Sequence, residues 1–248
     1  MTMVLSVAEV RKDFGGVHAL RGVSLSVAEG RIVGLIGPNG SGKTTLLNVI
    51  AGVEKPTAGT VTLDGRRIDR LPAHRVVELG IAKTHQIPKP FLGLTTRDNV
   101  GVAVLYGPRQ DRDVARAFDE ANWVLRLVGL ERHAETLAAN LTVQDRKRLE
   151  LARVIATGSR ILLLDEVFAG LSPDELREAM GLFTRLQKEI GFGALVVEHV
   201  MRAVLTLSDR VIVIDEGRKI AEGPPQAVVR QPAVIEAYLG REAARAAT

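Results

Sequence analysis

The sequence predicts an α/β fold with an inserted helical unit, on two observations. Residues 32–36, 161–164 and 194–197 are short, continuously apolar runs followed by helical patterns, which is typical of buried parallel strands. Between about residues 88 and 157, strand patterns give way to apolar residues at spacings of three and four. We therefore expect a core at residues 1–87 and 158–240, a helical subdomain at residues 88–157 and a C-terminal tail at residues 241–248.

The N-terminal segments predict a second, antiparallel sheet at the edge of the core. Residues 4–14 and 23–27 have strand patterns, and the near-alternation of apolar and polar residues in the second indicates one buried face. Residues 81–84 form a further short strand. Within the insertion, spacings of three and four indicate helix for the apolar residues Val114, Phe118, Ala121, Leu125 and Val128.

The second half of the chain contains a helix start and a hairpin. Ser172 is a predicted N-cap, with Pro173 at the first helical position and Glu175 at the third. Residues 209–215 and 218–222 are predicted to pair as two strands around a short turn. Helical patterns follow, and the Ala- and Arg-rich tail is expected to fray.

Length and composition limit the functional classes. A chain of 248 residues, 46% hydrophobic and 25% charged, suits a globular protein with a substantial core. It has neither a run of about 18 apolar residues nor an export signal, so we expect a cytoplasmic location. Zero cysteines exclude disulfides, thiolate metal sites and a cysteine nucleophile. The net charge of +4 is scattered and aromatic residues make up 4%, which argues against a nucleic-acid partner.

Residues 37–44 have the pattern G-x-x-x-x-G-K-T of a phosphate-binding loop, directly behind the apolar run 32–36. Glycines let main-chain N–H groups wrap a triphosphate, and a helix beginning near Lys43 adds its positive end. Lys43 is expected to reach the β- and γ-phosphates, and Thr44 to bind Mg²⁺. The alternative is a glycine-rich turn that binds nothing. The predicted nucleotide-binding residues of this segment are Gly37, Pro38, Asn39, Gly40, Ser41, Gly42, Lys43, Thr44 and Thr45.

Two carboxylates, Asp165 and Glu166, follow the apolar run 161–164. Burying an acid at the end of such a strand is costly without a partner. Mg²⁺ shared with Thr44 supplies that partner for Asp165, which leaves Glu166 to polarise the water that attacks the γ-phosphate. Taken alone, a pair of acids at a strand end more often caps the next element, and the phosphate loop is what favours the catalytic interpretation.

Two single polar residues complete the candidate set. His199 follows the run 194–197, where its imidazole could bond a γ-phosphate or satisfy a local carbonyl. Gln86 follows the short strand 81–84 and could orient the metal or the water, although an isolated glutamine is more often a surface hydrogen-bonder. The functional interpretation of both residues therefore depends on the order in which they and the other motifs occur along the chain.

That order resembles the ATP-binding cassette (ABC) ATPase family across nearly the whole chain. The resemblance implies a P-loop NTPase core in which residues 37–44 are the Walker A loop and residues 171–174 the D-loop. It also implies that Asp165 and Glu166 are the Walker B pair, His199 the switch histidine and Gln86 the Q-loop residue that contacts the metal. Phe14 would stack on the adenine of ATP, although on sequence alone it could equally be a core residue.

Within this family, residues 14–17, 86–91, 169–173 and 234–240 are similar to the ATPases of branched-chain amino acid importers. Subunits for urea or for lipopolysaccharide export share several of these strings, so the solute rests on analogy. The resemblance implies an ATP- and Mg²⁺-dependent ATPase on the cytoplasmic face of a bacterial or archaeal membrane. Its partners would be a second ATPase subunit, permease subunits and, indirectly, a solute-binding protein.

One departure concerns the family signature, usually Leu-Ser-Gly-Gly-Gln, which in this chain reads Leu141, Thr142, Val143, Gln144 and Asp145. In the family this loop contacts the γ-phosphate held by the other subunit of a dimer. Thr142 keeps a hydroxyl, but Val143 and Gln144 add Cβ atoms and Asp145 adds a negative charge near an anion. We therefore expect an impaired signature, which favours a heterodimer over a homodimer.

Two other classes of protein are alternatives to the importer. A nucleotide-gated binding or regulatory protein would bind ATP in a dimer but hydrolyse it weakly, because its signature is degraded. A soluble ABC protein of DNA repair or translation is disfavoured on family grounds, because the chain has neither a long coiled-coil insert nor a second cassette.

Overall fold

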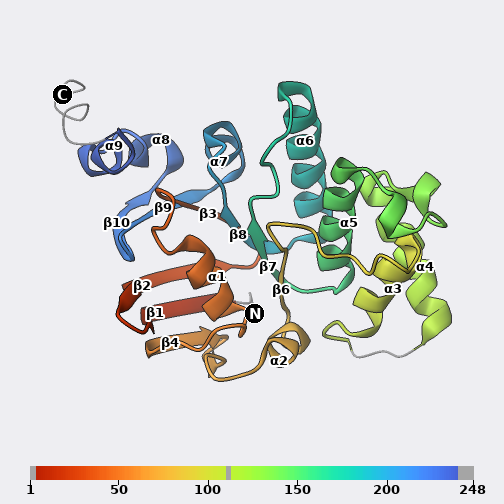
Figure 1. Cartoon of the computed structure of the whole chain (residues 1–248), viewed down its shortest axis with the longest axis horizontal. Coiled ribbons are helices and arrows are strands. Elements are labelled where there is room, and N and C mark those ends of the chain that lie inside the picture. Colours follow the sequence, from red (N-terminus) through yellow and green to blue (C-terminus); the bar gives the residue numbers. More distant parts are fainter. Residues whose placement is uncertain (1–3, 110–112, 240–248) are drawn as a thin grey trace.

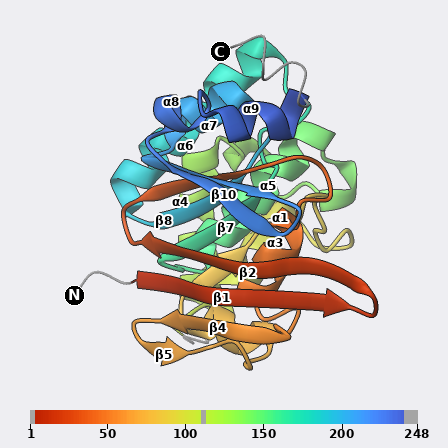
Figure 2. The same ribbon diagram turned by 90° about the vertical axis from the view of Figure 1, so that its left-hand side faces the viewer.

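The computed structural model describes residues 4–109 and 113–239, which form two β-sheets and their covering helices. The larger sheet has the strand order β10-β9-β3-β8-β7-β6 and the smaller one the order β2-β1-β4-β5 (Figures 1 and 2). In the larger sheet β3, β6, β7, β8 and β9 run parallel, and β10 pairs antiparallel with β9. Its strands are β3 (Ile32–Ile36), β6 (Ile81–Lys83), β7 (Ile161–Asp165), β8 (Gly193–Val197), β9 (Arg210–Asp215) and β10 (Arg218–Gly223).

The smaller sheet is antiparallel and forms one side of the molecule, as Figure 2 shows. Its strands are β1 (Val4–Phe14), β2 (Val17–Ala28), β4 (Ala58–Leu63) and β5 (Arg66–Arg67). Helix α1 (Lys43–Ile50) lies between the two sheets, and its buried side chains share one apolar cluster with both of them. Because α1 follows the phosphate-loop sequence directly, this packing fixes the loop relative to both sheets.

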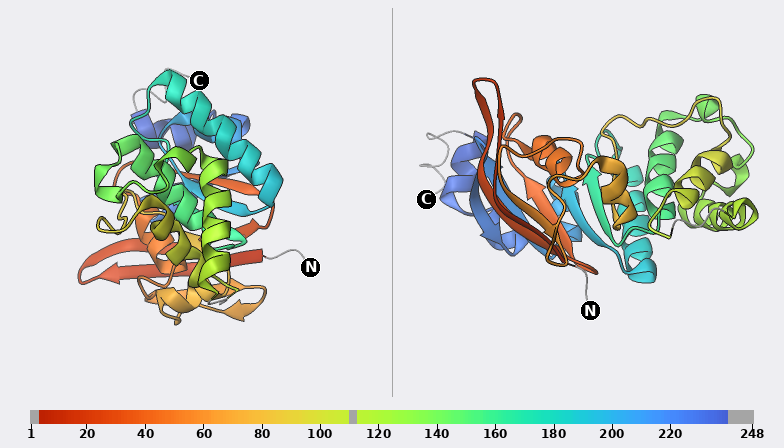
Figure 3. Two further views of the ribbon diagram at one scale, coloured as in Figure 1. Left: turned by 90° about the vertical axis from the view of Figure 1, so that its right-hand side faces the viewer. Right: turned by 90° about the horizontal axis from the view of Figure 1, so that it is seen from below.

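The helices of the segment 88–157 lie together at the end of the molecule opposite the C-terminal helices (Figures 1 and 3). They are α3 (Thr96–Leu105), α4 (Val114–Val128) and α5 (Val143–Ala156). With α6 (Pro173–Ile190) they cover one face of the larger sheet through a second apolar cluster. The remaining helices are α2 (Ala73–Glu78), α7 (Met201–Leu207), α8 (Pro225–Val228) and α9 (Pro232–Leu239), with short 3₁₀ turns at Glu131–His133 and Ala138–Asn140.

Most predicted elements are confirmed within one or two residues. Helix α6 begins with the predicted cap, since the Ser172 hydroxyl accepts the Glu175 N–H and the Glu175 carboxylate accepts the Ser172 N–H. The C-terminal hairpin is present as β9 and β10. Strand β2 begins at Val17 rather than at residue 23, and β4 was not predicted, because pairing with β1 on both sides extends strand structure through weakly patterned sequence. The tail 241–248 lies outside the described residues.

The helix predicted from spacings of three and four is confirmed as α4, but not all of those apolar residues are buried. Val114 is 54% exposed and Phe118 is half-buried beside Arg97, with the guanidinium carbon 5.2 Å from the ring centroid. The helix packs against both α3 and α5, so its buried stripe is wider and rotated toward Ala117 and Val124. The buried residues of α4 are Ala117, Ala121, Val124, Leu125 and Val128.

Strand order decides where the candidate residues meet. Strands β3, β8 and β7 are parallel neighbours, so their carboxyl ends lie at one edge of the sheet. The phosphate loop follows β3, the Asp165–Glu166 pair ends β7, and His199 follows β8. Gln86 follows β6, the neighbour of β7, at the same edge. Four stretches that are far apart in sequence therefore converge on one site.

Candidate functional site

The phosphate-loop residues form a tight turn between β3 and α1. Gly37 has φ +152°, and a Cβ added there would lie 1.9 Å from the carbonyl oxygen of Ile214. Gly42 has φ +102°, and a Cβ would lie 2.5 Å from the carbonyl oxygen of Ala19. At both positions the loop passes so close to neighbouring backbone that only glycine fits. The sequence pattern therefore has a steric cause that is visible in the fold.

Lys43 closes over this loop from the first turn of α1. Its Nζ donates to the carbonyl oxygens of Gly37 and Pro38, at 2.8 and 2.7 Å. Burial lowers the pKa of the Lys43 ammonium below its ordinary value, and the nearby Glu166 and Asp165 partly offset that shift. A cation held over a ring of main-chain groups at a helix start is suited to binding an anion such as a phosphate.

Asp165 is a buried carboxylate that lacks a hydrogen-bond partner. It is 1% exposed, and neither of its oxygens accepts a hydrogen bond from any residue the structure describes. The nearest cation is Lys83, whose Nζ lies 3.6 Å from Oδ2. Burial raises the pKa of Asp165, against the opposing charge of Lys83. A buried acid with unused acceptor capacity is the kind of group that a divalent cation satisfies.

Asp165 lines a groove of about 540 Å³ together with Thr44 and Gln86. These are the three residues that the sequence predicts as metal ligands, and all of them carry oxygen donors. The donor set fits Mg²⁺, which prefers oxygen ligands and retains several of its waters. The structure thus brings together residues from α1, from the end of β7 and from the segment after β6.

Glu166 lies between two polar side chains. Gln86 Nε2 donates to Glu166 Oε2 at 2.8 Å, and His199 Nδ1 lies 3.5 Å from Glu166 Oε1. The backbone of Glu166 is in the left-handed region, with φ +54°. All three predicted catalytic residues are therefore in one cluster, although they come from three different strand ends.

The cluster opens onto a cleft of about 820 Å³ that the phosphate loop borders. Part of its wall was not predicted, because β2 and the turn between β9 and β10 also contribute to it. The Arg21 N–H donates to the Gly217 carbonyl at 2.8 Å, which holds these two segments together. The cleft is lined by Val17, His18, Ala19, Arg21, Asn39, Gly40, Gly42, Lys43, Thr44, Thr45, Gln86, Glu166, His199, Glu216 and Gly217.

Phe14 does not line this cleft. It ends β1, is 45% exposed, and has the Nζ of Lys12 at 4.6 Å from its ring centroid. Val17, which pairs with Phe14 across the hairpin, lines the cleft instead. Among the loop residues, Gly37, Pro38 and Ser41 do not line the cleft, and Ser41 is 3% exposed. The adenine-stacking role of Phe14 stays a prediction.

Comparison with known proteins identifies the family of the chain. A family model described as "ABC transporter" matches residues 20–169, which include the phosphate loop and both acids. The chain belongs to the ABC transporter family. A second model, "Branched-chain amino acid ATP-binding cassette transporter", matches residues 218–244. As a member of this family the chain is an ATPase subunit coupled to transport, and ABC ATPases dimerise and work with membrane permease subunits.

Relatives of the chain cover nearly its whole length. The high-affinity branched-chain amino acid transport ATP-binding protein LivG of Salmonella typhimurium is 39% identical over 249 residues, covering 96% of this chain and 98% of LivG. BraF of Pseudomonas aeruginosa, a transport ATP-binding protein of the same description, is 36% identical with the same coverage. Among solved structures, the ADP conformation of the ATP-binding cassette MJ1267 matches with TM-score 0.85 and 28% identity, over 97% of this chain and 100% of that one. The dimeric cassette MJ0796 matches with TM-score 0.81 and 27% identity, over 89% of this chain and 98% of that one.

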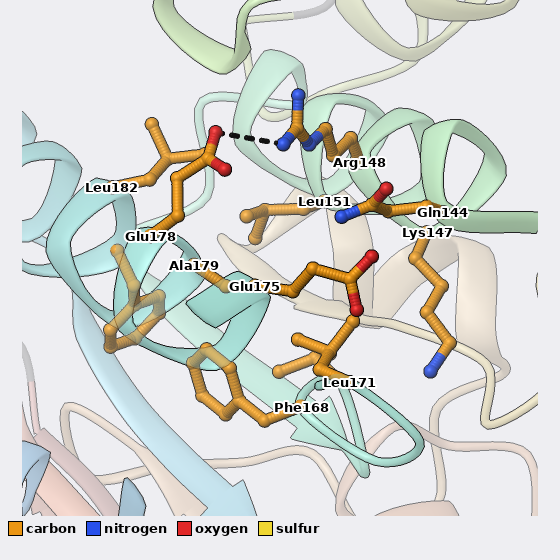
Figure 4. Close-up of a pocket in the computed structure, with 12 residues that line it drawn as sticks. Gln144, Lys147, Arg148, Leu151, Phe168, Leu171, Glu175, Glu178, Ala179 and Leu182 are labelled. Carbon is orange, nitrogen blue, oxygen red and sulfur yellow. Dashed lines mark hydrogen bonds and ion pairs between the residues drawn. The ribbon is translucent and has the colours of Figure 1, made fainter. Parts of the chain in front are cut away.

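The segment predicted to be the ABC signature lies at the beginning of α5 and does not line the cleft of the same chain. Thr142 is the N-cap of α5: its hydroxyl accepts the Asp145 N–H at 3.1 Å and donates to the Asp145 carboxylate at 2.7 Å. Val143 is 73% exposed, and Gln144 borders a small cavity between α5 and α6 (Figure 4). The Thr142 hydroxyl is thus engaged locally by the acid that replaces the usual glutamine.

Helix α5 also holds the segment that carries Gln86, an arrangement that the sequence did not reveal. The buried Glu150 accepts from the N–H and from Nδ1 of His85, at 3.1 and 2.8 Å, and from Arg153 at 2.8 Å. Arg153 also donates to the Lys89 carbonyl at 2.9 Å. Burial raises the pKa of Glu150, but the hydrogen bond from His85 and the charge of Arg153 outweigh burial, so that the pKa lies below its ordinary value.

Among the described residues, none of the helices is both long and apolar enough to cross a membrane.

Proposed function

We propose that this chain is the ATP-hydrolysing subunit of an importer of branched-chain amino acids, bound peripherally to the cytoplasmic face of a bacterial or archaeal membrane. The observation that carries the hydrolytic part is the position of Glu166, held between Gln86 and His199 beside the phosphate loop. The proposed solute is inferred from LivG and BraF. Their names specify branched-chain amino acids, and they match this chain over nearly their whole length.

The residues of the cleft have different roles in ATP hydrolysis. The loop N–H groups and Lys43 would bind the β- and γ-phosphates, and Thr44, Gln86 and Asp165 would hold Mg²⁺. When bound, this ion neutralises charge that develops on the phosphoryl oxygens. Glu166 accepts a hydrogen bond from the attacking water and orients it, while His199 donates to the γ-phosphate. Gln86 contacts both the metal site and Glu166, so it connects nucleotide binding to the catalytic carboxylate.

The partner surfaces follow from the same groove. Beside Gln86 the groove of about 540 Å³ is bordered by exposed apolar residues, among them Val53 and Ile87. We assign the outer part of this groove, at Val53 and Ile87, to a helix of the permease, which in turn works with a solute-binding protein. Exposed apolar side chains beside a concave surface are typical of such contacts.

The altered signature favours a heterodimer. In such a dimer the Walker A site of this chain would be completed by the intact signature of another cassette. The partner's own site would receive Thr142, Val143 and Gln144, where the added Cβ atoms keep the main chain from the phosphate and Asp145 repels it. A homodimer would carry this defect at both sites.

The same observation supports a second candidate, a nucleotide-gated binding or regulatory protein with weak hydrolysis. The local bonds between Thr142 and Asp145 occupy the hydroxyl that would otherwise face the phosphate of the other subunit. ATP would then close the dimer without being consumed at a useful rate. The two candidates differ in turnover and agree in nucleotide binding.

The test is Mg-ATP turnover by the purified chain, alone and with a signature-intact cassette as partner, with Glu166→Gln as control. The importer proposal expects turnover that depends on Glu166 and rises with the partner, and nucleotide affinity that Glu166→Gln leaves intact. Tight binding without turnover in either setting favours the regulatory candidate. Uptake of radiolabelled leucine, lost on disruption of the gene and restored by the wild-type chain only, tests the solute.

A further inference from the structure

Glu166 has a backbone conformation that its own residue type disfavours. Its φ of +54° lies in the left-handed region, which is unfavourable for a residue with a Cβ. Such a conformation persists only when surrounding contacts impose it. Glu166 begins the loop of residues 166–172 between β7 and α6, so the contacts of this loop decide where the carboxylate points.

The first of these contacts comes from Glu198, the residue before His199. Its side chain is 1% exposed, and Oε1 accepts the N–H of Phe168 at 2.7 Å. The N–H of Glu166 also donates to the Val197 carbonyl, at 2.9 Å. Burial raises the pKa of Glu198, because it disfavours the charged form of the carboxyl. We attribute the presence of a carboxyl at this buried position to the hydrogen bond that it accepts from Phe168. The end of β8 thus holds the beginning of the loop.

The second contact comes from the signature helix on the other side. Lys147 of α5 donates from Nζ to the carbonyl of Ala169, the residue after Phe168. Figure 4 shows Lys147 extending from α5 toward the loop that carries Phe168 and Leu171. A cavity of about 50 Å³ lies between α5, α6 and this loop, so side-chain packing there is incomplete. The hydrogen bond from Lys147 to Ala169 therefore restrains the loop where side-chain packing does not.

We propose that Glu198 and Lys147 are positioning residues of the ATPase reaction: Glu198 holds the N–H of Phe168, Lys147 holds the carbonyl of Ala169, and together they keep Glu166 directed at the cleft. The proposal rests on the proposed function, since it concerns the group that orients the attacking water. Neither residue lines the cleft. They act on turnover through the geometry of Glu166, because a displacement of about 1 Å at a reacting group can cost two orders of magnitude in rate.

The experiment compares Glu198→Ala, Glu198→Gln and Lys147→Met in the full chain with its partner cassette. Glu198→Ala removes the acceptor of the Phe168 N–H and should lower kcat by about tenfold or more, with KM for ATP unchanged within about twofold. Glu198→Gln retains an acceptor oxygen and should restore kcat to within about threefold of wild type. Lys147→Met keeps the apolar stem but removes the donor, and should lower kcat by about threefold or more.

A control variant separates positioning from loss of stability. Leu186→Ala truncates a buried residue of the same apolar cluster on α6, so it should lower the melting temperature but leave kcat within about twofold. Hydrogen exchange of the peptide that contains Phe168 gives a second readout. The Phe168 amide should exchange faster in Glu198→Ala than in wild type, and Glu198→Gln should retain its protection.

The outcomes distinguish this inference from the proposed function. Full kcat in Glu198→Ala, or a loss that Glu198→Gln does not reverse, would overturn the positioning role while Glu166-dependent turnover still stands. If Glu198→Ala does not fold, unchanged kcat in Lys147→Met overturns it. Absence of Glu166-dependent turnover in the wild-type pair would instead refute the proposed function, and the exchange rates would still report whether Glu198 holds the loop.

Discussion

Two buried aspartates should respond in opposite ways to the same substitution, Asp→Asn. Asp165 is 1% exposed and its oxygens accept no hydrogen bond within the described residues, whereas Asp69 is 3% exposed and pairs with Arg67 through contacts of 3.1 and 2.9 Å. Removing a buried charge that lacks good partners relieves its desolvation cost. Removing one that is paired breaks charge-assisted hydrogen bonds.

The expected sizes follow from these environments. Lys83 at 3.6 Å offsets part of the cost at Asp165, so we expect Asp165→Asn to raise the free energy of unfolding by about 1–2 kcal/mol without nucleotide. For a chain of 248 residues this corresponds to roughly 2–8 °C in melting temperature. Asp69→Asn should lower the free energy of unfolding by about 1 kcal/mol, because Arg67 is itself mostly exposed and loses little else.

Thermal unfolding followed by circular dichroism, with and without Mg-ATP, tests this reasoning. Wild type and Asp69→Asn should both gain about 2.7 kcal/mol at a nucleotide concentration 100 times Kd. Asp165→Asn should lose the part of that gain that depends on Mg²⁺. A lower melting temperature for Asp165→Asn without nucleotide would show that its carboxylate is stabilising, and an intact response to Mg²⁺ would refute its role as a ligand.

Three further predictions concern other parts of the site. Replacing residues 142–144 by Ser-Gly-Gly should raise turnover of the homodimer, as measured by phosphate release, because the main chain could then approach the phosphate. Glu150 has a lowered pKa, so its stabilising contribution should be present above its ordinary pKa of 4.5 and lost as pH falls through the folded value; Glu150→Gln should flatten the acid branch of stability against pH. Gly37→Ala should cost over about 3 kcal/mol in urea unfolding and Gly40→Ala about 1 kcal/mol, since only the first Cβ meets backbone.

Each of these has an outcome that would contradict it. Unchanged turnover after the Ser-Gly-Gly replacement would mean that Thr142 and its neighbours do not limit hydrolysis. An acid branch that is identical in Glu150→Gln would show that the His85 contact does not shift this carboxyl. Equal costs at Gly37 and Gly40 would show that φ, which is positive at both, matters more than the close approach to Ile214.

The sequence was sufficient where a local pattern has one physical solution. A loop of spaced glycines before Lys43 predicted the β3-to-α1 turn, because only glycine tolerates its backbone angles and close contacts. Continuous apolar runs predicted β3, β7 and β8, since only strands buried on both faces can use them. The cap at Ser172 predicted the start of α6, because its hydrogen bonds form within four residues.

Tertiary structure decided what depends on pairing and on distance. Strand β4 and the beginning of β2 form because each pairs with one edge of β1. A local sequence pattern does not reveal this pairing. Several contacts join residues far apart in sequence. They are the cleft wall at Arg21 and Gly217, the Glu150 contact with His85, and the two hydrogen bonds to the Phe168 N–H and the Ala169 carbonyl. The order of motifs in the sequence was enough to predict Glu166 as a catalytic residue. The backbone conformation that directs it toward the cleft is imposed by Glu198 and Lys147, because a strained residue keeps its conformation only through contacts with other residues.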